Sequence, residues 1–361
     1  MTGFRSMVVL GILMTGTFAL AQSGPQADLN ELYGKGQPEQ ALALGLDRLQ
    51  QTPDDRDLNH LVGRCLVDLG RFAEGKPYLQ KVVAAGARDW RYAWALDYLG
   101  RIAWVEGDDD AARRAWIEVR DGALTANVSR HAANCLRWYA LDTSFADWRR
   151  LQTAHCIFHF SPAHAERDLQ AFADEHEKAY EHLAAWFGGG TPWPVRIIVW
   201  GSLEEARSLS GISDLGFARP ELCLVHCLWG QTTGHELAHV VSYQALKPAA
   251  RTALVNEGLA VFSDLTGRDR LAMARQAVQA AGMKELDLAA WWEKAPADGT
   301  DVFYPVAGAW MQTLLDKGGK EKLLELCRDQ TLGRARVLYG DDLDIWMKDF
   351  SAALLTTGTG D

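Results

Sequence analysis

Apolar residues between positions 28 and 140 recur every three or four residues, which is the spacing of one face of a helix. Short runs of β-branched and aromatic residues follow at 156–160, 195–200 and 221–228, and each run predicts a strand. Helical spacing continues between these runs and dominates after residue 257. The pattern predicts an α+β protein in which an all-helical part, 28–140, precedes a part with a small mixed sheet, 152–355.

Glycines recur through the helical part at the period of a helix-turn-helix unit. Three of them precede a small residue by five positions: Gly36 with Ala41, Gly70 with Gly75, and Gly107 with Ala112. The glycines are separated by 34 and then 37 residues, and this period resembles the tetratricopeptide repeat, in which small residues let paired helices approach closely. We therefore expect tetratricopeptide-like repeats that recognise a protein partner; an irregular helical bundle is the alternative.

The residues with the most specific chemistry are His235-Glu236-Leu237-Ala238-His239. On a helix, His235 and His239 lie on one face one turn apart, so both imidazoles can reach a single small cation. Glu236 lies on a neighbouring edge of that face, close enough to act on a water bound to the cation. This His-Glu-x-x-His arrangement is typical of zinc metallopeptidases.

A third ligand is expected from Glu257, in a segment, Asn256–Ala260, that begins seventeen residues after His239. An acidic residue in an apolar run needs a partner if it is buried, and a cation would be that partner. Two histidines, one glutamate and an open fourth position describe a catalytic zinc site. We expect one Zn²⁺ per chain to activate a water, with Glu236 taking its proton and passing it to the leaving amine.

The two motifs resemble those of the gluzincin metallopeptidases, and the chain is similar to exported gluzincin-like domains that follow tetratricopeptide repeats in bacteria. The resemblance covers roughly residues 152 to 350 and implies a peptidase with the ligand set given above. Related domains place a tyrosine ahead of a helix at about this point, which makes Tyr304 a candidate to stabilise the oxyanion. In the enzymes that the chain resembles, the strand before the zinc helix is an edge strand that pairs with extended substrate, and 221–228 is a candidate for this role; an ordinary strand within the sheet is the alternative.

The charge and hydropathy of the chain limit which kinds of partner and which cellular location we expect. The net charge of −10 and the lack of a basic run argue against nucleic acid or an anionic membrane as the main partner. Arg5, an apolar run from Met7 to Leu20 and an Ala-x-Ala site ending at Ala21 predict a signal peptide over 1–21. No later run is long and apolar enough to span a bilayer, so we expect an exported protein, periplasmic or secreted, with a flexible tail at 356–361.

Six cysteines in an exported chain permit disulfides without requiring them. Cys223 and Cys227 would lie about 13 Å apart along a strand, too far to bridge each other, so buried or separately paired cysteines are expected. His155 and His159 flank another strand, where the same spacing is too long for them to share one ion. His226, close to the zinc helix in sequence, is a candidate to line the cleft.

Two other functions remain open from the sequence. The first is a catalytically inactive gluzincin-like domain on a tetratricopeptide scaffold that works by binding other proteins. The second is hydrolysis of a non-peptide amide or an epoxide at the same zinc. The complete set of His235, Glu236, His239 and Glu257 favours an active peptidase over the inactive scaffold.

Overall fold

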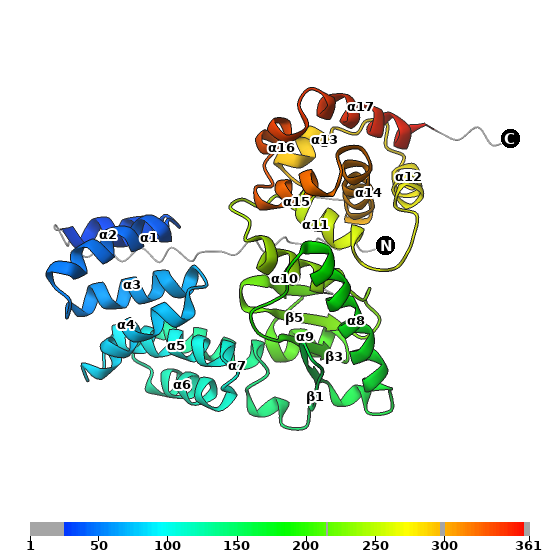
Figure 1. The fold of residues 1–361 in the computed structure, drawn as a ribbon. Helices are drawn as coiled ribbons and strands as arrows, with labels where there is room; N and C mark the ends of the chain where they lie inside the picture. The colour runs from blue at the N-terminus through cyan, green and yellow to red at the C-terminus, as the bar shows by residue number, and fades with distance from the viewer. Residues whose placement is uncertain (1–24, 214–215, 297–299, 357–361) are drawn as a thin grey trace. The chain divides into compact units, whose positions relative to one another are not determined.

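The computed structural model describes residues 25–213, 216–296 and 300–356, which divide into two compact units, 25–146 and 147–356 (Figure 1). The first unit is helical, and the second combines helices with a five-stranded sheet, so the expected α+β class is confirmed at this coarse level. Within the described ranges, no helix is both long and apolar enough to cross a membrane. The predicted signal peptide, 1–21, lies outside the described residues, as does the predicted tail from 357 on.

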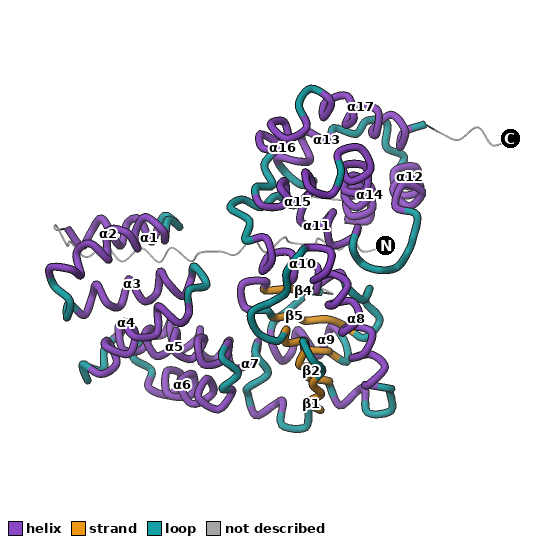
Figure 2. Tube along the Cα trace, in the orientation of Figure 1, coloured by secondary structure: helices purple, strands orange, loops and turns teal. Residues whose placement is uncertain are grey.

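The first unit is a succession of helices, each packed on the next (Figure 2). In chain order they are α1 (Pro25–Gly34), α2 (Pro38–Gln51), α3 (Arg56–Asp68), α4 (Phe72–Ala84), α5 (Trp90–Val105), α6 (Asp109–Gly122), α7 (Ala126–Trp138) and the short 3-10 helix η1 (Thr143–Phe145). Apolar side chains from neighbouring helices form the core of this unit.

The turns from α1 to α2, α3 to α4 and α5 to α6 have one shared backbone conformation. Each contains a glycine with positive φ: 73° at Gly36, 73° at Gly70 and 87° at Gly107. In each turn the glycine N–H donates to the carbonyl three residues earlier at 3.0–3.1 Å, and the next N–H donates to the carbonyl five residues earlier at 2.8–3.0 Å. This is a helix C-cap that favours glycine, so the recurring glycines mark equivalent helix ends.

The small residues five positions after these glycines are buried where two helices meet. A Cβ at Gly75 in α4 would lie 2.9 Å from the carbonyl oxygen of Gly63 in α3 and 3.0 Å from the side chain of Val67. Both distances are shorter than a normal van der Waals contact. The close packing of α3 and α4 therefore requires glycine at position 75.

We expect Gly75→Ala to lower the free energy of unfolding by about 1–3 kcal/mol, because α4 must move away from α3. Gly34→Ala is the control, since nothing lies within 4 Å of a Cβ added there. That change should be neutral or should stabilise the helix by up to about 1 kcal/mol. Urea unfolding followed by circular dichroism measures both, and equal effects would contradict the close-packing argument.

The second unit begins with the strands and continues with helices. Its elements are β1 (Arg149–Gln152), β2 (Cys156–Phe160), η2 (Pro162–His164), α8 (Leu169–Phe187), β3 (Val195–Trp200), α9 (Leu203–Ser210), β4 (Phe217–Arg219), η3 (Pro220–Leu222), β5 (Leu224–Leu228), α10 (His235–Leu246), α11 (Ala253–Phe262), α12 (Arg270–Ala280), α13 (Leu288–Glu293), α14 (Thr300–Gly318), α15 (Lys320–Arg328), α16 (Leu332–Tyr339) and α17 (Asp342–Leu355).

The sheet has the strand order β1-β2-β3-β5-β4, with β2, β3 and β5 parallel and an antiparallel strand at each edge. Phe158 lies opposite Ile197, and Ile197 lies opposite Val225, so the three side chains share one face. That face packs on α8 and α10 in the main core of this unit. Strands β2 and β3 are buried along their whole length, which explains why their sequences are apolar except at His159 and Arg196.

The structure corrects two predictions for the segment before α10. The strand predicted at 221–228 begins only at Leu224, because η3 occupies Pro220–Leu222 and Cys223 has a positive φ of 50°. This strand is also not at an edge, since β5 pairs with β3 on one side and with β4 on the other. The edge next to α10 is β4. All six cysteines of the chain are buried and free, the first of the two alternatives expected for them.

Two buried histidines make the second unit sensitive to acid. His159 in β2 and His176 in α8 are 8% and 7% exposed. Burial disfavours the charged imidazole and lowers the pKa of both side chains to about 4, and the nearby Arg196 and Arg150 act in the same direction on His159. An unfolded histidine has a pKa of about 6.5. Between pH 6.5 and 4 the unfolded state therefore binds more protons, and stability falls as the pH falls.

We expect the free energy of unfolding to decrease by about 2 kcal/mol per buried histidine between pH 7.5 and pH 5. A His159→Gln, His176→Gln double variant should show a much smaller decrease, because glutamine does not titrate in this range. His182→Gln, at an exposed position of α8, is the matched control and should keep the pH dependence of the parent. Urea unfolding at both pH values tests this; a double variant as acid-sensitive as the parent would exclude these histidines as the cause.

Candidate metal centre

The candidate site lies where α10 packs on α11 (Figures 1 and 2). Helix α10 begins at His235, directly after Gly234, which has a positive φ of 98°. The main chain of Gly234 lies against that of Asp264, since a Cβ at position 234 would be 3.4 Å from the carbonyl oxygen of Asp264. Glycine therefore fits both the left-handed backbone and the close approach, and it sets the first turn of α10 at the motif.

The structure brings His235 and His239 of α10 together with Glu257 of α11. The two imidazole rings lie 5.1 Å apart, centroid to centroid, and are perpendicular, at 89°. Glu257 Oε2 lies 3.6 Å from Nε2 of His235 and 3.4 Å from Nε2 of His239. Nitrogen and oxygen ligands of a tetrahedral zinc ion are about 3.3 Å apart. The three donor atoms, all within 4.8 Å of one another, could hold a metal ion.

The same proximity determines the protonation of the ligands. Burial opposes ionisation of Glu257, but the two histidines outweigh it and hold the pKa of this carboxyl well below its usual value. Burial also opposes the charged form of His239, yet the carboxylate of Glu257 raises the pKa of this imidazole. A raised pKa makes protons compete more strongly with a metal ion for His239, so metal affinity falls as the pH is lowered.

Glycine also explains how Glu257 reaches α10. The adjoining Gly258 faces α14, where an added Cβ would lie 2.6 Å from the carbonyl oxygen of Ala307. One turn on, a Cβ added at Gly308 of α14 would overlap the side chain of Val261 of α11. The two helices thus pack backbone against backbone on one side of α11, while Glu257 is directed to the histidines of α10.

Asn256 is part of the site, a role that the sequence analysis did not assign. Its side-chain amide lies 3.1 Å from Nδ1 of His239. When Nε2 binds a metal, Nδ1 carries the proton, and after rotation of the amide group the oxygen of Asn256 can accept a hydrogen bond from this N–H. In the sequence, this role of Asn256 is indicated by its position directly before the carboxylate ligand, Glu257.

Glu236 and Tyr304 flank the cluster on two sides. The carboxylate of Glu236 lies directly on Gly216, so closely that no Cβ fits there, and Gly216 leads into the edge strand β4. Tyr304 lies in the second turn of α14, and its ring centroid is 6.2 Å from that of His235. Tyr304 is 37% exposed. The structure therefore places all five candidate residues in one region.

The remaining histidines lie apart from this region. His226, a candidate for the cleft, is 1% exposed and stacks on Trp200 at 5.8 Å, so it belongs to the sheet core. His155 pairs with Glu177 of α8, whereas His159 is buried in β2, in agreement with the argument that they do not share an ion.

No protein-family model matches the sequence, and no curated protein shows detectable similarity to it.

We expect Glu257→Gln to weaken Zn²⁺ binding by roughly 100-fold or more, because an amide of the same shape replaces the anionic ligand. Asn256→Ala should weaken it by roughly 10- to 100-fold, since His239 loses its neighbour at Nδ1. Glu285→Gln, an exposed carboxylate, is the control and should leave affinity unchanged. Competition with a chelator of known affinity measures zinc binding by all three variants. If Glu257→Gln bound zinc as tightly as the parent, the third ligand would be another residue.

Proposed function

We propose that this protein is an exported zinc metallopeptidase whose N-terminal, tetratricopeptide-like helices recognise a protein partner or substrate. The observation that carries the proposal is the convergence of His235, His239 and Glu257 from two helices, with Glu236 beside them. Two imidazoles and one carboxylate with an open position form the ligand set of catalytic zinc in gluzincin-like peptidases. When bound, zinc would act as a Lewis acid towards a scissile carbonyl and an attacking water.

Glu236 is the general base of this proposal. It follows a ligand on α10, and its carboxylate lies against the main chain before β4. It takes a proton from the attacking water and delivers it to the leaving amine, a role that a carboxylate in contact with the reacting atoms can perform. Tyr304, on the opposite helix α14, donates a hydrogen bond from its hydroxyl to the developing oxyanion.

The edge strand β4 supplies a surface for substrate. Among the described strands, β4 pairs with β5 on one side and lies at the edge of the sheet on the other. An extended peptide can add to such an edge through main-chain hydrogen bonds. Gly216 contacts the carboxylate of Glu236 and directly precedes β4. A peptide bound along β4 would therefore pass close to the proposed base.

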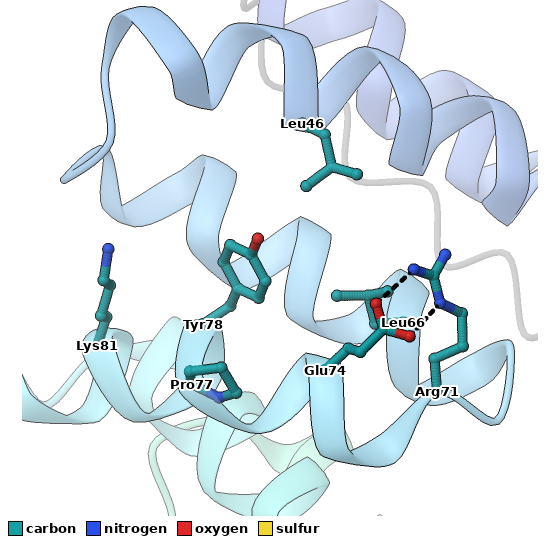
Figure 3. Close-up of a pocket in the computed structure, with 7 residues that line it drawn as sticks. All are labelled: Leu46, Leu66, Arg71, Glu74, Pro77, Tyr78 and Lys81. Carbon is teal, nitrogen blue, oxygen red and sulfur yellow. Dashed lines mark hydrogen bonds and ion pairs between the residues drawn. The ribbon is translucent and has the colours of Figure 1, made fainter.

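The helical unit supports a binding role through a groove of about 490 Å³ between α2, α3 and α4 (Figure 3). Its walls are apolar at Leu46, Leu66 and Pro77, and Tyr78 adds an aromatic surface. Arg71 and Lys81 are at opposite ends, and Arg71 is held by Glu74 at 2.6 Å. Such a mixture of apolar walls and charged ends suits an extended protein segment.

Glu236→Gln tests the proposed chemistry. The variant should keep its fold and its zinc but lose peptide hydrolysis by a factor of roughly 10² to 10⁴, because the base is removed and the ligands are not. The assay is cleavage of a mixed peptide library, analysed by mass spectrometry, by protein containing zinc. Glu204→Gln, an exposed residue of α9, is the control and should cleave like the parent.

Two results would count against the proposal. Full activity in Glu236→Gln would exclude this carboxylate as the base. A folded parent that binds zinc and cleaves no peptide in the library would favour the inactive binding scaffold.

A further inference from the structure

A second group of metal-ligand side chains lies in the helical unit, remote in sequence from the first. Asp97 of α5 and His131 and Cys135 of α7 each direct one donor atom to a common point, and these atoms lie within 4.8 Å of one another. His131 and Cys135 are four residues apart, so they occupy one face of α7. Asp97 is completely buried and Cys135 is 1% exposed, whereas the side chain of His131 is 29% exposed.

Only one of the two carboxylate oxygens of Asp97 has a hydrogen-bond partner among the described residues. Its Oδ1 lies 3.0 Å from Nδ1 of His131, but no described residue offers a hydrogen bond to its buried Oδ2. The nearby Trp116 donates to the main-chain oxygen of Asp97, and Arg101, one turn further on, pairs with Asp68. A buried carboxylate oxygen without a partner is strongly unfavourable, and a cation would satisfy it.

The distances fit a small tetrahedral ion that has nitrogen, oxygen and sulfur ligands. Zinc binds nitrogen and oxygen at about 2.0 Å and sulfur at about 2.3 Å, so tetrahedral neighbours are about 3.3 Å apart for N and O and about 3.6 Å for N and S. Nδ1 of His131 lies 3.0 Å from Oδ1 of Asp97 and 3.6 Å from Sγ of Cys135. The ring of Trp94 lies 5.6 Å from that of His131 and limits how the imidazole can turn.

We propose that Asp97, His131 and Cys135 form a second zinc site, which joins α5 to α7. Binding of Zn²⁺ releases the thiol proton of Cys135 and any proton held between His131 and Asp97 to solvent. The ion, one carboxylate and one thiolate then form a neutral unit, which suits a buried position. Water would be the fourth ligand. This site does not depend on the proposed peptidase function, because it uses other helices and other residues.

Cobalt distinguishes the two sites, because only this one contains a sulfur ligand. We expect metal-free, full-length protein titrated with Co²⁺ to bind two ions and to show a thiolate-to-cobalt charge-transfer band in the near ultraviolet. Cys135→Ser should bind one ion and lose the band. His235→Ala, His239→Ala should bind one ion and keep the band, so failure at either site is recognised separately.

Cys65→Ser is the matched control, since Cys65 is a buried free cysteine of the same unit, and this variant should keep the band. Circular dichroism verifies that each variant is folded. A folded parent that is saturated with Co²⁺ and shows no charge-transfer band would overturn the proposal. A band that persists in Cys135→Ser would do so as well, since the sulfur ligand would then be another residue.

Discussion

The arrangement of the second unit depends on a half-buried carboxylate. Glu257 lies on a helix that is otherwise apolar, and its charge is tolerated because two imidazoles of α10 lie within 3.6 Å of it. That requirement fixes how α10 and α11 pack. The opposite side of α11 packs closely on α14, which is possible because Gly258 and Gly308 carry no side chains of their own at the contact. The sheet in turn supports α10 through the apolar face that it shares with α8.

The local elements of this unit were predictable where sequence and burial agree. The strands at 156–160 and 195–200 occur with the expected bounds because both are buried on two faces and are rich in β-branched and aromatic residues, with His159 and Arg196 as the exceptions. The segment at 221–228 was only partly correct, because a left-handed residue, Cys223, interrupts a run that looks continuous in sequence. Strand β4 has three residues, too few for an alternating pattern to be recognised in the sequence. In the sheet it lies outside β5, although it precedes β5 in the chain.

The candidate site was predictable for a related reason. The spacing of His235 and His239 is a local property of one helix, and the carboxylate ligand, Glu257, belongs to the next motif along the chain. The contacts of Asn256 with His239, of Gly216 with Glu236 and of Tyr304 with His235 are made across elements, and no spacing along the chain reveals them. In the helical unit, Asp97 and His131 lie 34 residues apart, so their pairing depends equally on how α5 and α7 pack.

The two edges of the sheet have a consequence for the protein in concentrated solution. An open edge can pair with the edge of another copy, and long, flat, apolar edges do so readily. Here β1 has four residues and carries exposed Arg149 and Arg150, while β4 has three residues and carries Arg219. Both edges are short, and like charges would face each other if two copies met edge to edge. Short edges that carry charge disfavour pairing with another copy, and within the described residues this is the protection that the sheet has, since no further strand covers either edge.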